Sequence, residues 1–191
     1  MRRRQYLAAT GAAAAGLAGC AGLPFGEAPD IDESELAPVE FSSPAVEDGT
    51  LPAEYTCDGE GISPPLAIGS PPNRADSFAI VVDRTDGPAA PSAYWLIWDV
   101  PIDTREIPAG VPKEPRIQQP FRATQGLTLG STVGYLRPCP EPGTTAEYEF
   151  TCYAVLGETL GAPERAKRKE VLSHVADTVV GIGSFTVSYG R

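Results

Sequence analysis

The side chains that most often carry out catalysis are scarce and widely spaced in this sequence. His174 is the only histidine, and it lies beside a predicted apolar helix stripe rather than in it. Such a residue is more often exposed on a helix surface than catalytic. A nucleophilic serine would need a motif such as Gly-x-Ser-x-Gly, which is missing. Asp83 could serve as a base, but the sequence offers no partner to set its pKa. We therefore expect a protein that is not an enzyme.

The cysteines do not form a metal-binding pattern either. Cys57, Cys139 and Cys152 are far apart in the sequence, whereas zinc ligands usually come in closely spaced pairs. A single histidine is also too few for the usual mixed zinc sites. We expect no metal site and no cofactor.

Residues 1–19 have the composition of a signal peptide. A basic start is followed by a short apolar stretch that is too short and too rich in glycine for a membrane-spanning helix. Arg3-Arg4 fits the twin-arginine export pattern. Leu17-Ala-Gly-Cys20 fits a lipobox, in which Cys20 becomes the lipidated first residue, although an ordinary signal peptide with a chance cysteine is the alternative. The predicted location is the extracytoplasmic side of the cell membrane, with a lipid anchor on Cys20.

The segment 20–38 is predicted to be an acidic tether, and a domain is predicted over 39–191. Several prolines and acidic residues without a hydrophobic period favour an extended chain. The formal charge of −10 becomes −13 when the three arginines of residues 1–19 are removed. Such an acidic protein is not expected to bind nucleic acid. The acidity fits either a solvated surface adapted to high salt or a docking face for a basic partner.

The elements that would position any site are mainly β-strands. Residues 77–83 and 94–100 are continuous apolar runs, and 147–156 and 184–189 alternate between apolar and polar side chains. One helix is predicted over 163–180, where an apolar stripe ends at Gly181. A helix between strands permits one β-α-β crossover in an otherwise antiparallel fold. The segment 102–143 is loop-like, with a strand signal only at 127–136, and long ordered loops often carry function.

Several segments in order resemble one known family. They are 47–59, 62–66, 81–83, 94–101, 107–110, 125–126, 134–135, 138–143, 148–150 and 153–154. This pattern is similar to the bacterial and archaeal members of the phosphatidylethanolamine-binding (Raf kinase inhibitor-like) family, and it covers residues 40–191. The resemblance implies two packed antiparallel sheets with a helix near the C-terminus, close to a small anion site that takes phosphate or phospholipid head groups in some members.

The implied site is altered in this chain. Asp83, Pro138 and Tyr148 match the family pattern, whereas Tyr94 and Ala146 replace its two histidines and Arg137 replaces its loop glycine. Arg137 would restore a cation if it pointed inward, so that Asp83, Tyr94, Arg137, Pro138 and Tyr148 form an anion site. In the alternative, Arg137 points into solvent or pairs with a carboxylate, and the pocket has lapsed.

The resemblance also places Cys57 and Cys139 in loops that border the implied pocket, so a disulfide between them is the preferred pairing; three buried thiols are the alternative. The predicted function is a lipid-anchored binding module for an anionic small molecule or phospholipid head group. The alternative is an inhibitor-like module with a lapsed pocket that binds a protein partner.

Overall fold

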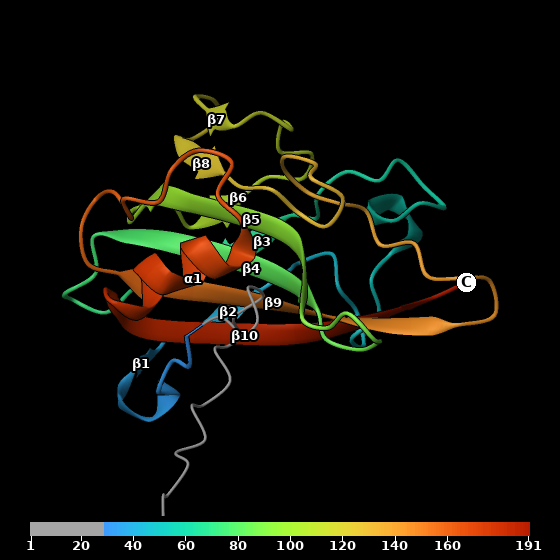
Figure 1. Ribbon diagram of the computed structural model, residues 1–191, viewed down its shortest axis with the longest axis horizontal. Helices are drawn as coiled ribbons and strands as arrows, with labels where there is room; N and C mark the ends of the chain where they lie inside the picture. Colours follow the sequence, from blue (N-terminus) through green and yellow to red (C-terminus); the bar gives the residue numbers. More distant parts are fainter. Residues whose placement is uncertain (1–28) are drawn as a thin grey trace, which may run out of the picture.

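The computed structural model describes residues 29–191, and its main regular elements are two β-sheets (Figure 1). The strands in chain order are β1 (Ala37–Pro38), β2 (Phe41–Ser42), β3 (Leu66–Ile68), β4 (Ser77–Arg84), β5 (Ser92–Pro101), β6 (Glu106–Ile107), β7 (Arg116–Ile117), β8 (Ala123–Gln125), β9 (Thr145–Val155) and β10 (Val179–Gly190). The helices are α1 (Arg168–Ala176) and two short 3-10 turns, Glu33–Glu35 and Ala53–Tyr55.

The larger sheet has the strand order β1-β10-β9-β4-β5-β8-β7, and the smaller one has the order β2-β3-β6. All neighbouring strands are antiparallel except β1 and β10. The prediction of a mainly β fold with two packed sheets and a helix near the C-terminus is therefore confirmed.

Two hydrophobic cores lie on opposite faces of the larger sheet. The first fills the space between the two sheets and contains Trp95, Phe150, Leu66 and Ile107, each at most 1% exposed. The second lies under α1, where Val171 and Val175 pack against the other face of the sheet. Strands β4 and β5 have both faces covered, which explains why their sequences are continuous apolar runs rather than alternating ones.

The predicted β-α-β crossover is not formed. Strands β9 and β10 flank α1 in the sequence, but they are antiparallel neighbours over most of their length. After α1 the chain returns as β10, which runs along the edge of β9. The helix α1 covers one face of the sheet (Figure 1), and its apolar stripe is buried there. The parallel pair is instead formed by β1, which adds to the free edge of β10.

The helix is shorter than the predicted range 163–180. Before it, the backbone N–H of Leu127 donates to the carbonyl of Ala166 at 2.9 Å, and the N–H of Arg165 donates to the carbonyl of Gln125 at 3.2 Å. These bonds to a distant loop hold residues 163–167 outside the helix. After it, residues 179–180 already belong to β10, so Gly181 lies within a strand and does not end the helix.

The fold begins before residue 39. Ile31 packs against the core under α1, and β1 at residues 37–38 pairs with β10, so the segment 20–38 is not an extended tether along its whole length. Close approach of this segment explains two of the glycines of β10, Gly181 and Gly183. A Cβ on Gly181 would lie 2.9 Å from the carbonyl oxygen of Ala37, and one on Gly183 would overlap the carbonyl oxygen of Val39.

The segment 102–143 is largely loop, as predicted, and contains only the short strands β6, β7 and β8 among its described residues. The expected strand at 127–136 is reduced to isolated bridges of Leu127 with Val133 and with Lys167. The side chain of Gln125, which is fully buried, keeps this loop ordered. Its side chain accepts from Trp95 Nε1 at 2.7 Å and donates to the carbonyls of Pro112 and Glu114. A satisfied buried amide of this kind fixes the loop on β5.

The substitution Gly183→Ala should destabilise the protein by about 1–3 kcal/mol, because the new methyl group has to displace the backbone at Val39. Gly190→Ala in the same strand is the control, since its Cβ meets the Thr145 side-chain hydroxyl, which can rotate away. Urea unfolding of both variants measures the difference. Equal stability of the two variants would contradict the close packing of the N-terminal segment on β10.

Candidate functional site

The predicted site residues lie on two opposite faces of the larger sheet. Tyr94 and Tyr148 belong to the core between the sheets. Asp83 follows Val82, which faces that same core, and side chains alternate along a strand. Asp83 therefore points to the opposite face, toward α1. The expectation that Asp83, Tyr94 and Tyr148 line one site is wrong in this respect.

Asp83 is engaged by the helix. Both of its carboxylate oxygens accept from Arg168 Nε, at 2.8 and 2.9 Å, and the residue is only 8% exposed. Burial raises the pKa of Asp83, and the charge and hydrogen bonds of Arg168 partly offset that rise. Arg137, which was expected in the same anion site as Asp83, has no part in this pair. Arg168 was not among the predicted site residues.

Tyr94 and Tyr148 form a closed aromatic pair. Their ring centroids are 5.0 Å apart in an edge-on arrangement, and they are 7% and 0% exposed. The hydroxyl of Tyr148 is buried and has no hydrogen-bond partner among residues 29–191. Burial, followed by the charge of Tyr94, raises the pKa of Tyr148, and the charge of Arg84 opposes that rise. The Tyr94 side chain also raises this pKa as a weak hydrogen-bonding neighbour, although the two hydroxyls do not have the geometry of a hydrogen bond. The Tyr148 hydroxyl is thus a neutral buried donor.

The cation nearest to this pair is Arg84, a residue that the sequence analysis did not select. Arg84 lies directly opposite Tyr148 in the β4–β9 register, on the same face of the sheet. Its Nε donates to Asp86 Oδ1 at 2.9 Å. The bond to Asp86 raises the pKa of Arg84, so the guanidinium stays charged. The sequence signal that could have identified Arg84 is the alternation of side chains along β4, because it places residues 83 and 84 on different faces of the sheet.

The loop that covers the tyrosines is held by several links. The N–H of Leu136 donates to the carbonyl of Tyr94 at 2.7 Å, and the hydroxyl of Tyr135 donates to the carbonyl of Tyr55 at 3.0 Å. The Cys57–Cys139 disulfide, with a Cα–Cα distance of 5.3 Å, joins the same two loops, and it is the pairing that the sequence favoured. Cys152 is a buried free thiol in the core between the sheets.

Arg137 and Pro138 lie in this covering loop. Pro138 is buried, and its carbonyl accepts from the N–H of Cys57 at 3.0 Å. Arg137 is exposed and forms no hydrogen bond or ion pair within the described part of the chain. Its side-chain stem packs close to Gly61, and its charge contributes, after burial, to a lowered pKa of Lys113. Arg137 is therefore a rim cation rather than the inward-pointing partner of Asp83.

The surface clefts formed by described residues lie elsewhere. A cleft of about 590 Å³ lies between the β7–β8 region and the loop before α1, and two smaller ones lie near Pro101 and Asp103. No group of three or more His, Cys, Asp or Glu side chains in residues 29–191 is arranged to hold a metal ion. In the same range, no helix is long and apolar enough to cross a membrane.

The arrangement of Tyr94, Tyr148 and Arg84 is suited to holding an anionic oxygen. An unpaired buried hydroxyl can donate a hydrogen bond, and the neighbouring guanidinium provides a permanent positive charge. The raised pKa of Tyr148 keeps its hydroxyl protonated at neutral pH, so this hydroxyl can act as a hydrogen-bond donor.

The fold is a two-sheet β domain with one helix on the outer face of its large sheet and with two tyrosines under a disulfide-linked loop. Residues 41–190 match the family described as phosphatidylethanolamine-binding protein. The chain belongs to this family.

Relatives and solved structures agree with this assignment. The UPF0098 protein of Pyrococcus abyssi is 34% identical over 154 residues, covering 80% of this chain and 85% of the relative. The Chlamydia trachomatis protein CT736, described as a homolog of the family, superposes with a TM-score of 0.70 at 25% identity, over 81% of this chain and 98% of its own. Escherichia coli YbcL, described as a member of the mammalian family, shares the fold with a TM-score of 0.73 at 20% identity, over 81% of this chain and 99% of its own.

The substitution Arg168→Ala should lower the free energy of unfolding by roughly 1–3 kcal/mol at neutral pH, because the buried carboxylate of Asp83 loses its partner. The pKa of Asp83 in the folded state is already raised above 3.8, and it should rise further in the variant. The cost is therefore full above the pKa of Asp83 in the folded variant and disappears as the pH falls below its pKa in the folded wild type, which itself lies above 3.8.

Chemical unfolding of the wild type and Arg168→Ala across the acidic pH range measures this dependence. In the double variant Asp83→Asn/Arg168→Ala, the part of the cost that depends on pH should disappear. A cost that stays constant with pH would show that Arg168 stabilises the fold by packing rather than by pairing with Asp83.

Proposed function

We propose that this protein is a lipid-anchored binding module rather than an enzyme, and that its domain binds an anionic small molecule or phospholipid head group beside Tyr148. The observation that carries this proposal is the buried hydroxyl of Tyr148, which has no hydrogen-bond partner within residues 29–191. An unsatisfied buried donor costs about 1–3 kcal/mol, so a ligand oxygen that accepts its hydrogen bond gains more than it would from an exposed donor.

The charge beside Tyr148 selects an anion. Arg84 uses Nε and Nη2 to bind Asp86, whereas its Nη1 makes no hydrogen bond with any described residue. A phosphate or carboxylate oxygen near the ring edge of Tyr148 can accept from the Tyr148 hydroxyl and lie close to this guanidinium. Tyr94 provides a second hydroxyl and Arg137 adds positive charge at the rim. Such a site fits the family resemblance, which implies phosphate or phospholipid head-group binding in some members.

The membrane anchor is supported by sequence. Leu17-Ala-Gly-Cys20 and the preceding basic and apolar residues lie outside the described residues, so the evidence for this part of the proposal within the chain is the sequence motif. A Mycobacterium tuberculosis protein named "Putative lipoprotein LppC" is 29% identical over 154 residues, which cover 78% of this chain and 72% of that protein. This likeness supports a lipid anchor on Cys20 and a location on the extracytoplasmic side of the cell membrane.

A second candidate function is that of a protein-interaction module with a lapsed pocket. The observation in its favour is the closure of the site, since Tyr94 is 7% exposed and Tyr148 is not exposed at all. In addition, Arg168 occupies both carboxylate oxygens of Asp83. An intact fold without affinity for any phosphate compound would favour this function over ligand binding.

The substitution Tyr148→Phe should weaken the binding of phosphoethanolamine or inorganic phosphate by about ten- to a hundredfold. It removes a hydrogen bond to a charged group, worth about 1.5–3 kcal/mol. The ligand-free variant should be as stable as the wild type or more stable, because the phenyl ring fills the same space without an unpaired donor. Isothermal titration calorimetry and thermal unfolding measure the two effects.

Tyr153→Phe is the matched control, because this tyrosine lies on the opposite face of β9 and packs with the core under α1. Its binding should equal that of the wild type. Arg137→Ala tests the rim cation, and it should weaken binding less than Tyr148→Phe does. If the wild type binds none of these compounds, or if Tyr148→Phe binds as tightly as the wild type, the ligand site is wrong.

The substitution Cys20→Ser should release the protein from the membrane, because it removes the sulfur that carries the lipid. Cell fractionation followed by a high-salt wash measures the distribution, and Cys152→Ser is the control that keeps the anchor. A Cys20→Ser protein that remains in the washed membrane fraction would refute the lipid anchor.

A further inference from the structure

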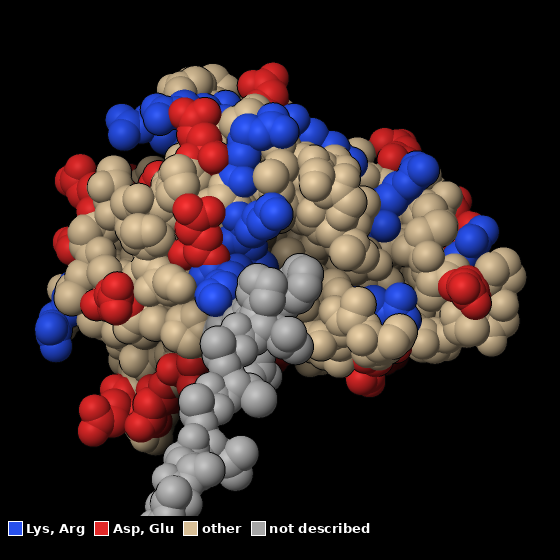
Figure 2. Space-filling view, in the orientation of Figure 1, with Lys and Arg blue, Asp and Glu red and all other residues tan. Residues whose placement is uncertain are grey.

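Positively charged side chains gather on one side of this acidic protein. Figure 2 shows them running from the top of the molecule, over β7 and β8, down to the start of α1, with only a few acidic residues between them. We call this surface the basic strip. It consists of the exposed residues Lys113, Arg116, Arg122, Arg165, Lys167 and Lys169.

The basic strip joins two segments that are far apart in the sequence. The N–H of Arg165 donates to the carbonyl of Gln125 in β8, and Lys167 forms a parallel bridge with Leu127. These contacts bring the residues before α1 against the region of β7 and β8. The 590 Å³ cleft lies at this junction, and its charged lining consists of Arg116 and Arg122 together with Asp99, Glu158 and Glu164.

Most of the charge of the basic strip is not neutralised. Arg116 forms an ion pair with Glu164, whereas the other five strip residues form no ion pair within residues 29–191. Arg168 is adjacent to strip residues in the sequence but is excluded from the basic strip, because it forms an ion pair with Asp83. Glu170 in the first turn of α1 is the nearest acidic residue on the helix.

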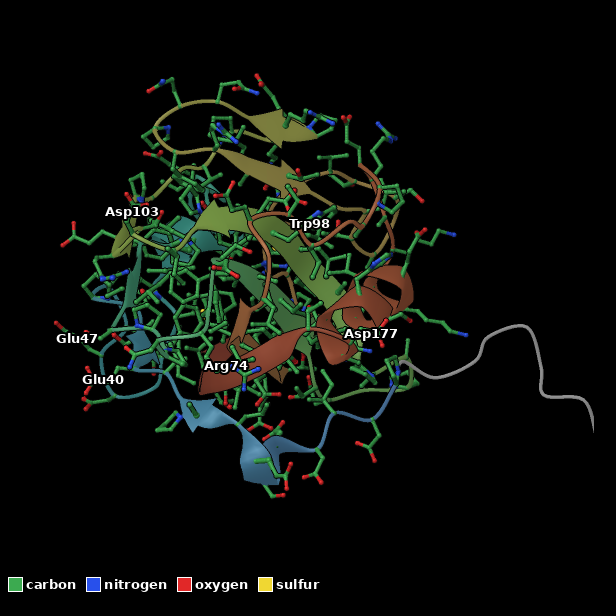
Figure 3. The ribbon with its side chains drawn as sticks, turned by 90° about the vertical axis from the view of Figure 1, so that its left-hand side faces the viewer. Glu40, Glu47, Arg74, Trp98, Asp103 and Asp177 are labelled. Carbon is green, nitrogen blue, oxygen red and sulfur yellow. A yellow bond between two sulfur atoms is a disulfide. The ribbon has the colours of Figure 1, made fainter. Side chains whose placement is uncertain are left out.

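The acidic side chains dominate other parts of the surface. The beginning of the fold carries Asp32, Glu33 and Glu35, next to β1, and β1 and β7 form the two opposite edges of the larger sheet. Figure 3 shows Glu40, Glu47 and Asp103 on the side of the molecule opposite to α1. The protein is therefore electrically asymmetric, and an anionic surface would attract it through the basic strip alone.

The chain enters the fold on the side of the basic strip, so a lipid anchor at Cys20 would hold this side toward the membrane. Ile31 packs against the core under α1, so the chain enters the fold on the helix side of the larger sheet. Cys20 precedes Ile31 by eleven residues, which span at most about 40 Å when fully extended.

We propose that the basic strip docks the domain on the anionic head groups of the membrane that holds its lipid anchor. The orienting role in the cell rests on the proposed anchor at Cys20, whereas the affinity of the strip for anionic lipid does not. Clusters of Lys and Arg close to an anionic bilayer are attracted within a Debye length of its surface. The short connection raises the local concentration of the strip at the bilayer, so weak contacts are sufficient.

The test uses the full chain with Cys20→Ser, so that binding does not depend on the lipid. Sedimentation with vesicles of phosphatidylglycerol and phosphatidylcholine at low ionic strength should bring down the protein, and pure phosphatidylcholine vesicles should not. Each cation lost should weaken partitioning about fivefold, so Arg122→Gln/Arg165→Gln in this background should weaken it about 25-fold.

The matched control is Arg74→Gln/Arg105→Gln, which changes the net charge equally at two exposed arginines outside the strip. Its partitioning should equal that of the parent. Binding to neutral vesicles, equal losses in both double variants, or absence of binding to the anionic vesicles would each overturn the proposal. The anchor is tested separately by fractionation of cells, so one proposal can fail while the other holds.

Discussion

The arrangement of the whole domain depends on the burial of β4 on both of its faces. Seven consecutive residues, Ser77–Asp83, are buried in this strand, which lies between β9 and β5 in the larger sheet. Its side chains alternately enter the core between the sheets and the core under α1. Because the period of a strand is two, the strand cannot shift by one residue without exchanging the contents of the two cores.

The same alternation separates two adjacent charged residues at the end of β4. Asp83 points toward α1 and pairs with Arg168, whereas Arg84 lies beside Tyr148 and pairs with Asp86. Each charge therefore has its own partner, on its own face. The sheet shields the two pairs from each other, so the tyrosine site can keep its cation although a carboxylate is the next residue in the chain.

The strands were predictable where local pattern and tertiary burial agree. The ranges 77–83 and 94–100 were identified because strands covered on both faces are continuous apolar runs. The start of α1 was not predictable, since the bonds that hold residues 165–166 lead to residues 125–127, far away in the sequence. The role assigned to Gly181 failed for the same reason, because the close approach of Ala37 is visible only once β1 is in place.

Sequence reasoning missed Arg84 and the basic strip for a related reason. The family resemblance drew attention to Asp83 and Arg137, while Arg84 gains its place only through its register with Tyr148. The basic strip was overlooked because its residues come from two separate segments, and net charge alone describes the chain as strongly acidic. Composition reports a sum, whereas binding responds to the local arrangement of charges.

One ion pair connects the basic strip with the end of β4. Arg168 stands between Lys167 and Lys169 of the basic strip, and Asp83 holds its guanidinium with both oxygens. The pair thus fixes the first turn of α1 on the sheet. Asp83 is also the neighbour of Arg84, the cation beside Tyr148. The end of β4 therefore holds the first turn of α1 on one face and contributes Arg84 to the proposed anion site on the other, through two consecutive residues.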